Sequence, residues 1–218
     1  MQLEKLAKSH KEFKEKYLSE YATRFQELAV KGQSPKVLFI SCSDSRVIPN
    51  LITHTNPGDL FIDRNVGNLV PPFQPGSECT AVSASIEYAV AHLHVEDIIV
   101  CGHSFCGACK ALYEESDPND TKTEHLTRWL EYAKESKLSA LAMVGREDKD
   151  ALLRATERFN VIAQLKNLLS YPVVQDALEE GKLFIQGWYY HIESGDLEYF
   201  DPIEHRFKAL DEIDIKTD

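Results

Sequence analysis

Two short polar motifs carry side chains of the kinds that bind transition metals. One reads Cys42-Ser-Asp-Ser-Arg46, the other reads His103-Ser-Phe-Cys106, and each directly follows an apolar run. Zinc accepts thiolate and imidazole ligands in a tetrahedral shell, and three protein ligands with one open position are typical of a catalytic site. The sequence therefore predicts a zinc ion held by Cys42, His103 and Cys106, with a water molecule in the fourth position.

The apolar runs before these motifs, residues 36–41 and 97–101, have the pattern of strands that are covered on both faces. The carboxyl ends of neighbouring parallel strands meet at one edge of a sheet, where loops converge on a ligand. Two segments far apart in the sequence could therefore meet at the metal. Gly102 and Gly107 flank the second motif, and we expect them to relieve crowding in its turn.

Asp44 and Arg46 follow the first ligand at alternate positions and are predicted to act beside the metal. On a protein surface such an ion pair contributes under about 1 kcal/mol. Next to zinc, Asp44 could bind the ion directly, or it could accept a hydrogen bond from the reacting water. A bidentate contact from Arg46 would hold the carboxylate away from the ion, so we expect the hydrogen-bonding role for Asp44.

Cys106 also begins a Cys-x-x-Cys pair with Cys109, which offers an alternative interpretation of the second motif. Such a pair could be a redox motif or half of a structural zinc site. A four-cysteine site needs a second close pair, which the other cysteines do not form, and a redox pair would leave His103 unexplained. The five cysteines form an odd set, so we expect reduced thiols. The three that are not ligands are predicted to be small buried residues: Cys79, Cys101 and Cys109.

Strands alternate with helices along the rest of the chain. Further strands are predicted at 60–63, 183–191 and 197–200, with a turn at 193–196 between the last two, and helices at 77–91, 123–135 and 149–169. The predicted fold class is α/β: a mostly parallel central β-sheet flanked by helices, with the last strand pair as an antiparallel edge.

The amino-terminal segment is predicted to form an amphipathic helical arm up to about residue 28. Gly32 and Pro35 end the pattern. We divide the chain into this arm, residues 1–34, and a single α/β zinc-enzyme domain, residues 35–218. The apolar stripe of the arm needs a partner, which is either its own domain or a neighbouring subunit. Its residues recur at steps of three and four: Leu3, Leu6, Phe13, Tyr17, Tyr21, Phe25 and Leu28.

The composition predicts a soluble protein with one main core. Its 218 residues carry a net charge of −11 and are 43% hydrophobic. Nucleic acids and anionic membranes repel such a chain, so neither is an expected partner. The amino terminus is charged and no apolar run approaches the length of a membrane span, so we expect a cytoplasmic location.

The two motifs resemble the paired Cys-x-Asp-x-Arg and His-x-x-Cys signatures of the β-carbonic anhydrase family. Segments 57–61, 64–68, 85–90 and 187–190 also look like family segments in the family's order. The resemblance implies Cys42, His103 and Cys106 as zinc ligands and Asp44 with Arg46 as the catalytic pair. It further implies five substrate-binding residues, with Asn56 in place of a Gln found in plant-type members: Asn56, Phe61, Val66, Tyr88 and Gly107.

The resemblance implies reversible hydration of CO2 to bicarbonate by a zinc-activated hydroxide, with a use in carbon utilization. It also implies a homodimer or a higher homo-oligomer with active sites near the subunit interface. Two other functions fit the same residues: hydrolysis of a CO2 analogue such as CS2 or COS, and a non-catalytic zinc-bearing scaffold in which Asp44 closes the site.

Overall fold

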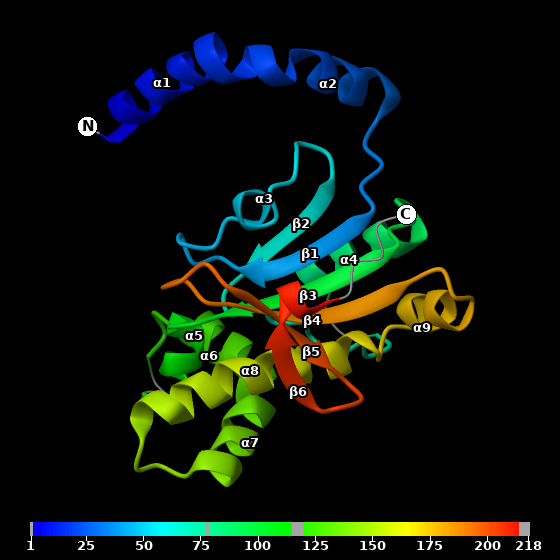
Figure 1. Ribbon diagram of the computed structural model, residues 1–218. Helices are drawn as coiled ribbons and strands as arrows, with labels where there is room; N and C mark the ends of the chain where they lie inside the picture. The colour runs from blue at the N-terminus through cyan, green and yellow to red at the C-terminus, as the bar shows by residue number, and fades with distance from the viewer. Residues whose placement is uncertain (1, 77–78, 115–119, 214–218) are drawn as a thin grey trace.

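A six-stranded sheet forms the centre of the protein in the computed structural model, which describes residues 2–76, 79–114 and 120–213 (Figure 1). The strand order is β2-β1-β3-β4-β5-β6. The first four strands run parallel to one another and the last two are antiparallel, as predicted. The strands are β1 (Val37–Cys42), β2 (Leu60–Asn65), β3 (Asp97–His103), β4 (Phe184–Tyr190), β5 (Leu197–Asp201) and β6 (Arg206–Ala209).

Helices connect the parallel strands and pack on the sheet, which confirms the predicted fold class. The predicted helix at 77–91 begins at Ala81 in the structure, where Thr80 caps it by accepting from the Ser83 amide; residue 77 lies outside the described residues. The helices after β1 are α3 (Pro49–Ile52), α4 (Ala81–Ala91), α5 (Gly107–Ala111), α6 (Glu124–Leu130), α7 (Lys134–Val144), α8 (Lys149–Leu168) and α9 (Pro172–Glu179), with 3₁₀ turns at Glu131–Ala133 and Leu210–Glu212.

The sequence prediction omits five elements: α3, α5, α7, α9 and β6. A 3₁₀ turn separates α6 from α7, so the helical stretch does not stop near residue 135 as predicted but resumes for eleven residues. α9 and β6 have eight and four residues, which is too short for a periodic pattern to stand out. β6 pairs with β5 and forms the antiparallel edge of the sheet.

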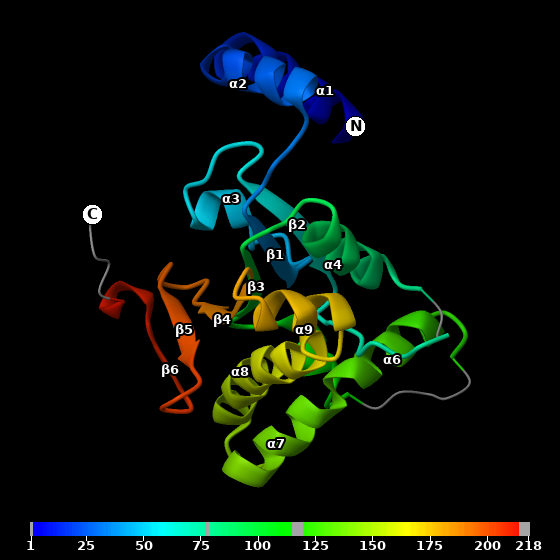
Figure 2. The same cartoon turned by 90° about the vertical axis from the view of Figure 1, so that its right-hand side faces the viewer.

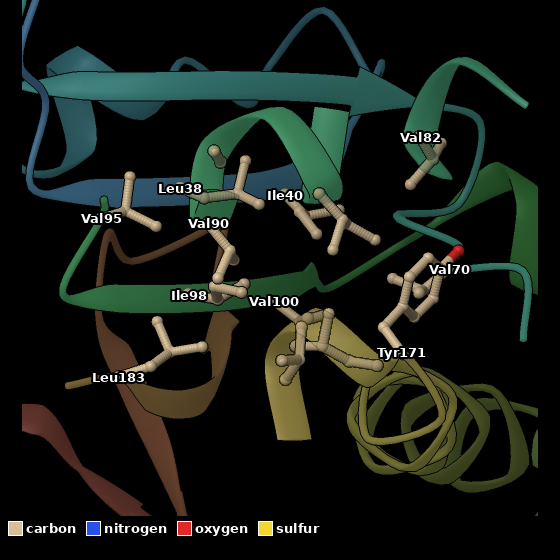
Figure 3. Packing of buried hydrophobic residues seen from close by; sticks show 14 residues of the cluster. Leu38, Ile40, Val70, Val82, Val90, Val95, Ile98, Val100, Tyr171 and Leu183 are labelled. Carbon is tan, nitrogen blue, oxygen red and sulfur yellow. The ribbon is translucent and has the colours of Figure 1, made fainter. Parts of the chain in front are cut away.

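The main core lies on one face of the sheet. Leu38 and Ile40 of β1 and Ile98 and Val100 of β3 are fully buried there (Figure 3). Side chains of α4, α8 and α9 cover them, together with Tyr171, which directly precedes α9. Each fully buried side chain of this size contributes about 1.5–3 kcal/mol relative to its exposed state. This packing holds β1 and β3 side by side, and their carboxyl ends carry the two polar motifs.

Helix α8 approaches the sheet closely because β3 and β4 present glycines to it. A Cβ atom at Gly102 would lie 2.6 Å from Cγ2 of Val161, and one at Gly187 would lie 2.8 Å from Cγ1 of the same side chain. The expected relief of crowding therefore applies to Gly102, although the crowding comes from α8 rather than from the turn. At Gly107 the expectation is wrong, since a Cβ there would meet nothing within 4 Å.

We expect Gly102→Ala to lower the free energy of unfolding by about 1–3 kcal/mol, because the added methyl group pushes α8 off the sheet. Urea denaturation measures this change. Adding Val161→Ala should recover part of the loss, and Gly107→Ala serves as the control that adds the same methyl group in open space. Equal stability of the Gly102→Ala and Gly107→Ala variants would contradict the close approach.

The amino-terminal arm is one long helix interrupted by a π-helical turn: α1 (Gln2–Glu12), the turn Phe13–Tyr17 and α2 (Leu18–Lys31). α1 and the turn have no buried residue and stand away from the sheet (Figure 2). α2 is fixed to the loop before β2, where Arg24 contacts Asp59 and donates to the Pro57 carbonyl at 2.5 Å. No helix among the described residues is long and apolar enough to span a bilayer.

Candidate metal centre

The structure brings the three predicted ligands together. Cys42 is the last residue of β1, His103 is the last residue of β3, and Cys106 follows three residues later. One ligand atom from each side chain lies within 4.8 Å of the other two, and all three residues are buried. The parallel pairing of β1 with β3 explains this convergence, because it places both strand ends at the same edge of the sheet.

The imidazole of His103 is oriented for binding a metal through Nε2. Its Nδ1 lies 2.8 Å from the Ser104 carbonyl oxygen, so Nδ1 carries the proton and donates it. Nε2 is buried and has no hydrogen-bond partner among the described residues. A buried imidazole nitrogen without a partner is costly, and a metal ion would satisfy its lone pair.

The two thiols also fit a cation. Contact with Cys106, together with burial, raises the pKa of the Cys42 thiol to about 12. Contact with Cys109 is the main cause that raises the pKa of the Cys106 thiol. Two buried thiolates side by side repel each other, and a bound divalent ion removes that penalty. Two thiolates and one imidazole are a zinc ligand set, so these residues fit Zn2+.

Asp44 and Arg46 form the bidentate pair that the sequence predicts. Arg46 Nε lies 2.9 Å from Oδ1 of Asp44, and Nη2 lies 2.8 Å from Oδ2. The Arg46 amide also donates to Oδ1. These hydrogen bonds hold the pKa of Asp44 well below its usual range, so the carboxylate stays charged and keeps its orientation.

Further hydrogen bonds join the first ligand loop to its neighbours. The Gly67 amide lies 3.4 Å from Sγ of Cys42, which suits an amide donating to a thiolate. Arg64 donates to the Cys42 carbonyl at 3.1 Å and to the Asp44 carbonyl at 2.7 Å. Arg46 also reaches the second loop, where Nη2 donates to the Phe105 carbonyl at 3.1 Å.

Only two of the five predicted substrate residues lie near the metal group of the same chain. Val66 follows β2, whose last residue pairs with Cys42, and Gly107 follows Cys106 directly. Phe61 lies four residues before the end of β2, which is about 13 Å at the usual rise of a strand. Asn56 precedes the same strand, and the ring of Tyr88 packs on Phe61 with centroids 5.8 Å apart. These three therefore lie at the opposite end of the sheet.

One prediction about the cysteines is wrong. Cys101 and Cys109 are buried, but Cys79 is exposed, and it directly precedes Thr80, the amino-terminal cap of α4. No disulfide joins the five cysteines.

Sequence reasoning missed Glu157, a buried carboxyl on α8 that accepts a hydrogen bond from the Cys106 amide at 2.8 Å. Burial raises its pKa to about 7, while a hydrogen bond from Tyr189 acts in the opposite direction. The only signal in the sequence is a polar stripe on the predicted helix: Glu157, Asn160, Gln164 and Asn167. Such a stripe normally faces solvent, so the pattern alone does not reveal the contact.

The fold and the site define an α/β protein with a buried Cys-His-Cys group that could hold a metal ion. The sequence model of the carbonic anhydrase family matches residues 37–197. The chain belongs to the β-carbonic anhydrase family, which confirms the predicted family and enzyme class.

Two relatives and two solved structures illustrate the similarity. The carbonic anhydrase of Pseudomonas aeruginosa is 46% identical over 190 residues, which cover 86% of this chain and 83% of that protein. The carbonic anhydrase of Synechococcus elongatus is 38% identical over 214 residues, which cover 98% and 77%. The beta-carbonic anhydrase CcaA has a TM-score of 0.85 at 37% identity, with 96% of this chain and 100% of that chain covered. One of two tetrameric beta-carbonic anhydrases from Sordaria macrospora has a TM-score of 0.77 at 30% identity, with 96% of each chain covered.

Proposed function

We propose that this chain catalyses the reversible hydration of CO2 to bicarbonate at a zinc ion held by Cys42, His103 and Cys106. The observation that carries the proposal is the convergence of three buried donor atoms within 4.8 Å at one edge of the sheet. Three protein ligands leave one position of a tetrahedral ion open for a reactant, and the family membership indicates which reactant it is.

Zn2+ supplies Lewis acidity, which makes a water molecule nucleophilic near neutral pH. Asp44 would accept a hydrogen bond from that water, since the Arg46 clamp fixes the orientation of both carboxylate oxygens. The same clamp keeps Asp44 from becoming a fourth ligand. Arg46 therefore controls access to the fourth position of the ion. That position stays open while the ion pair between Arg46 and Asp44 persists.

We propose that the substrate pocket is completed by a second subunit. Val66 and Gly107 lie beside the metal group, whereas Asn56, Phe61 and Tyr88 lie at the far end of the sheet. In a symmetric dimer, the far-end residues of one subunit can reach the site of the other. CO2 has no charge, so apolar side chains such as Phe61 and Val66 suit its binding.

The arm of residues 1–34 is proposed to contribute to this assembly, next to the α/β domain of residues 35–218. Its exposed apolar side chains include Leu3, Leu6, Phe13 and Tyr17. A helix with an uncovered apolar stripe is stabilised by a partner, and a neighbouring subunit offers one. We propose a homodimer or a higher homo-oligomer that acts in the cytoplasm in carbon utilization, without nucleic-acid or membrane partners.

The test is stopped-flow CO2 hydration by metal-quantified protein between about pH 6 and pH 9. We expect kcat/KM to rise about tenfold across this range as the reacting water loses its proton. Asp44 does not produce this rise: its lowered pKa keeps it charged at every pH above the usual value for aspartate, and its ion pair is lost only below that. Chelated protein is the control, and readdition of zinc should restore the rate. Zinc-loaded protein without activity at any pH would contradict the proposal.

A further inference from the structure

Helix α8 presents a buried polar stripe to the two loops that carry the metal ligands. Oε1 of Glu157 accepts from the Cys106 amide at 2.8 Å, and Nδ2 of Asn160 donates to the Gly67 carbonyl at 2.9 Å. The Gly67 amide in turn contacts the Cys42 sulfur. Cys106 is therefore linked to α8 through its own backbone amide. Cys42 is linked to α8 indirectly, through the backbone of Gly67.

The second ligand loop needs such support because its backbone is strained. Phe105, which precedes Cys106, has a φ of 58°, in the left-handed region that bulky side chains disfavour. Such a conformation is unfavourable for a non-glycine residue and persists only where the surroundings enforce it. The side chains of His103 and Cys106 must both point toward one ion. The reversal of the chain at Phe105 makes this possible.

Two side chains of α8 hold this reversal. The guanidinium of Arg154 lies over the Phe105 ring, 4.1 Å from its centroid. Glu157 holds the next amide, that of Cys106. Both come from one turn of the helix and are themselves joined by an ion pair of 2.9 Å.

Glu157 is fixed in place from several sides. It is 1% exposed, and its Oε2 accepts from the Tyr189 hydroxyl of β4 at 2.7 Å. Its helix is seated against Gly102 of β3, directly before His103. The carboxylate of Glu157 therefore has a fixed position from which it can hold the ligand loop, unlike a flexible surface side chain.

We propose that Glu157, together with Arg154, is a positioning residue that holds the strained Phe105–Cys106 segment and thereby fixes the geometry and retention of the metal. The inference rests on the proposed zinc site. It assigns the two residues no contact with CO2. Their removal should therefore loosen the metal more than it disturbs the fold.

The first experiment measures zinc release to a colorimetric chelator from the zinc-loaded full-length protein. Glu157→Ala should release zinc about 10–100 times faster than the wild type, as is usual for residues that orient metal ligands. Glu157→Gln retains an acceptor for the Cys106 amide and should stay within about threefold. The cobalt-substituted proteins provide a spectroscopic readout: the thiolate charge-transfer and d–d bands should change in Glu157→Ala and not in Glu157→Gln.

Thr156→Val is the matched control. Thr156 is also fully buried on α8, but its hydroxyl bonds to the Leu152 carbonyl and to Tyr113, neither of which belongs to the ligand motifs at 42–46 and 103–106. It should lose stability without faster zinc release. Arg154→Ala keeps the test falsifiable if Glu157→Ala does not fold, because Arg154 is partly exposed and its loss should still speed release several-fold.

A double variant tests the role of the strained residue. Glycine adopts a positive φ without steric cost, so Phe105→Gly should reduce the effect of Glu157→Ala to within about threefold. An unchanged effect in that background, or equal zinc release from Glu157→Ala and Thr156→Val, would overturn the positioning role. If the wild type itself binds no zinc and lacks hydration activity, the proposed function fails. If it is zinc-loaded and active, only the inference is at stake.

Discussion

Replacing Cys106 with alanine should remove zinc from the protein and reduce CO2 hydration at least roughly 10⁴-fold, because enzymatic accelerations typically exceed about 10⁶ and this one depends on the metal. The thiol of Cys106 is one of the three donors that converge at this group among the described residues. The measurement combines metal analysis with stopped-flow hydration on the same preparation.

Cys109→Ala is the matched control for this loss. Cys109 is also buried and packs with Cys42 and Cys106, but its sulfur does not belong to the convergent group. We expect this variant to retain its zinc and to hydrate CO2 at a rate within severalfold of the wild type. The opposite ranking of the two variants would favour the Cys106–Cys109 pair as the functional unit and would contradict the proposed ligand set.

Replacing Arg46 with alanine should lower kcat/KM about 10–100-fold while zinc remains bound. Without the two hydrogen bonds from Arg46, the Asp44 carboxylate is free to turn, and it can then compete for the open position of the ion. Arg46→Lys should give an intermediate rate, since an ammonium group keeps the charge but cannot form the bidentate contact.

Arg206→Ala is the control with the same spacing elsewhere in the chain. Arg206 forms an ion pair of 2.7 Å with Glu204, two residues before it. Glu204 lies in the exposed turn before β6, and Arg206 is the first residue of β6. Its removal should leave hydration unchanged, as is usual for a surface pair. An Arg46→Ala enzyme as active as this control would show that the clamp has no part in the reaction.

The sequence allows the strands and the ligand set to be predicted for a clear physical reason. Strands β1 and β3 are covered on both faces and appear as uninterrupted apolar runs, and the metal-binding residues follow them at once. Parallel strands end at the same edge, so proximity of Cys42 to His103 follows from topology alone. The bidentate contact between Asp44 and Arg46 follows from their close spacing, which needs no long-range information.

Other features depend on contacts that a sequence pattern does not encode. The stripe on α8 shows the helical period, but whether Glu157 faces water or the Cys106 amide is decided by how α8 docks on Gly102 and Gly187. The left-handed residue of the ligand loop is Phe105, although glycine is the usual choice. The positions of Asn56 and Phe61 relative to the metal group also follow only from the strand register.

Because of the pairing of β1 with β3, metal binding by the Cys-His-Cys group reports whether these two strands are paired in the correct register. Ser41 lies opposite Cys101 in this register, so Cys42 is level with Gly102 and close to His103. A slip of one residue would turn the Cys42 side chain to the other face of the sheet and leave the proposed zinc ion with two ligands. The number of metal ions bound per chain would therefore measure the fraction of molecules in a preparation whose strands are in register. An overall measure of secondary structure does not distinguish these molecules from those with a slipped strand.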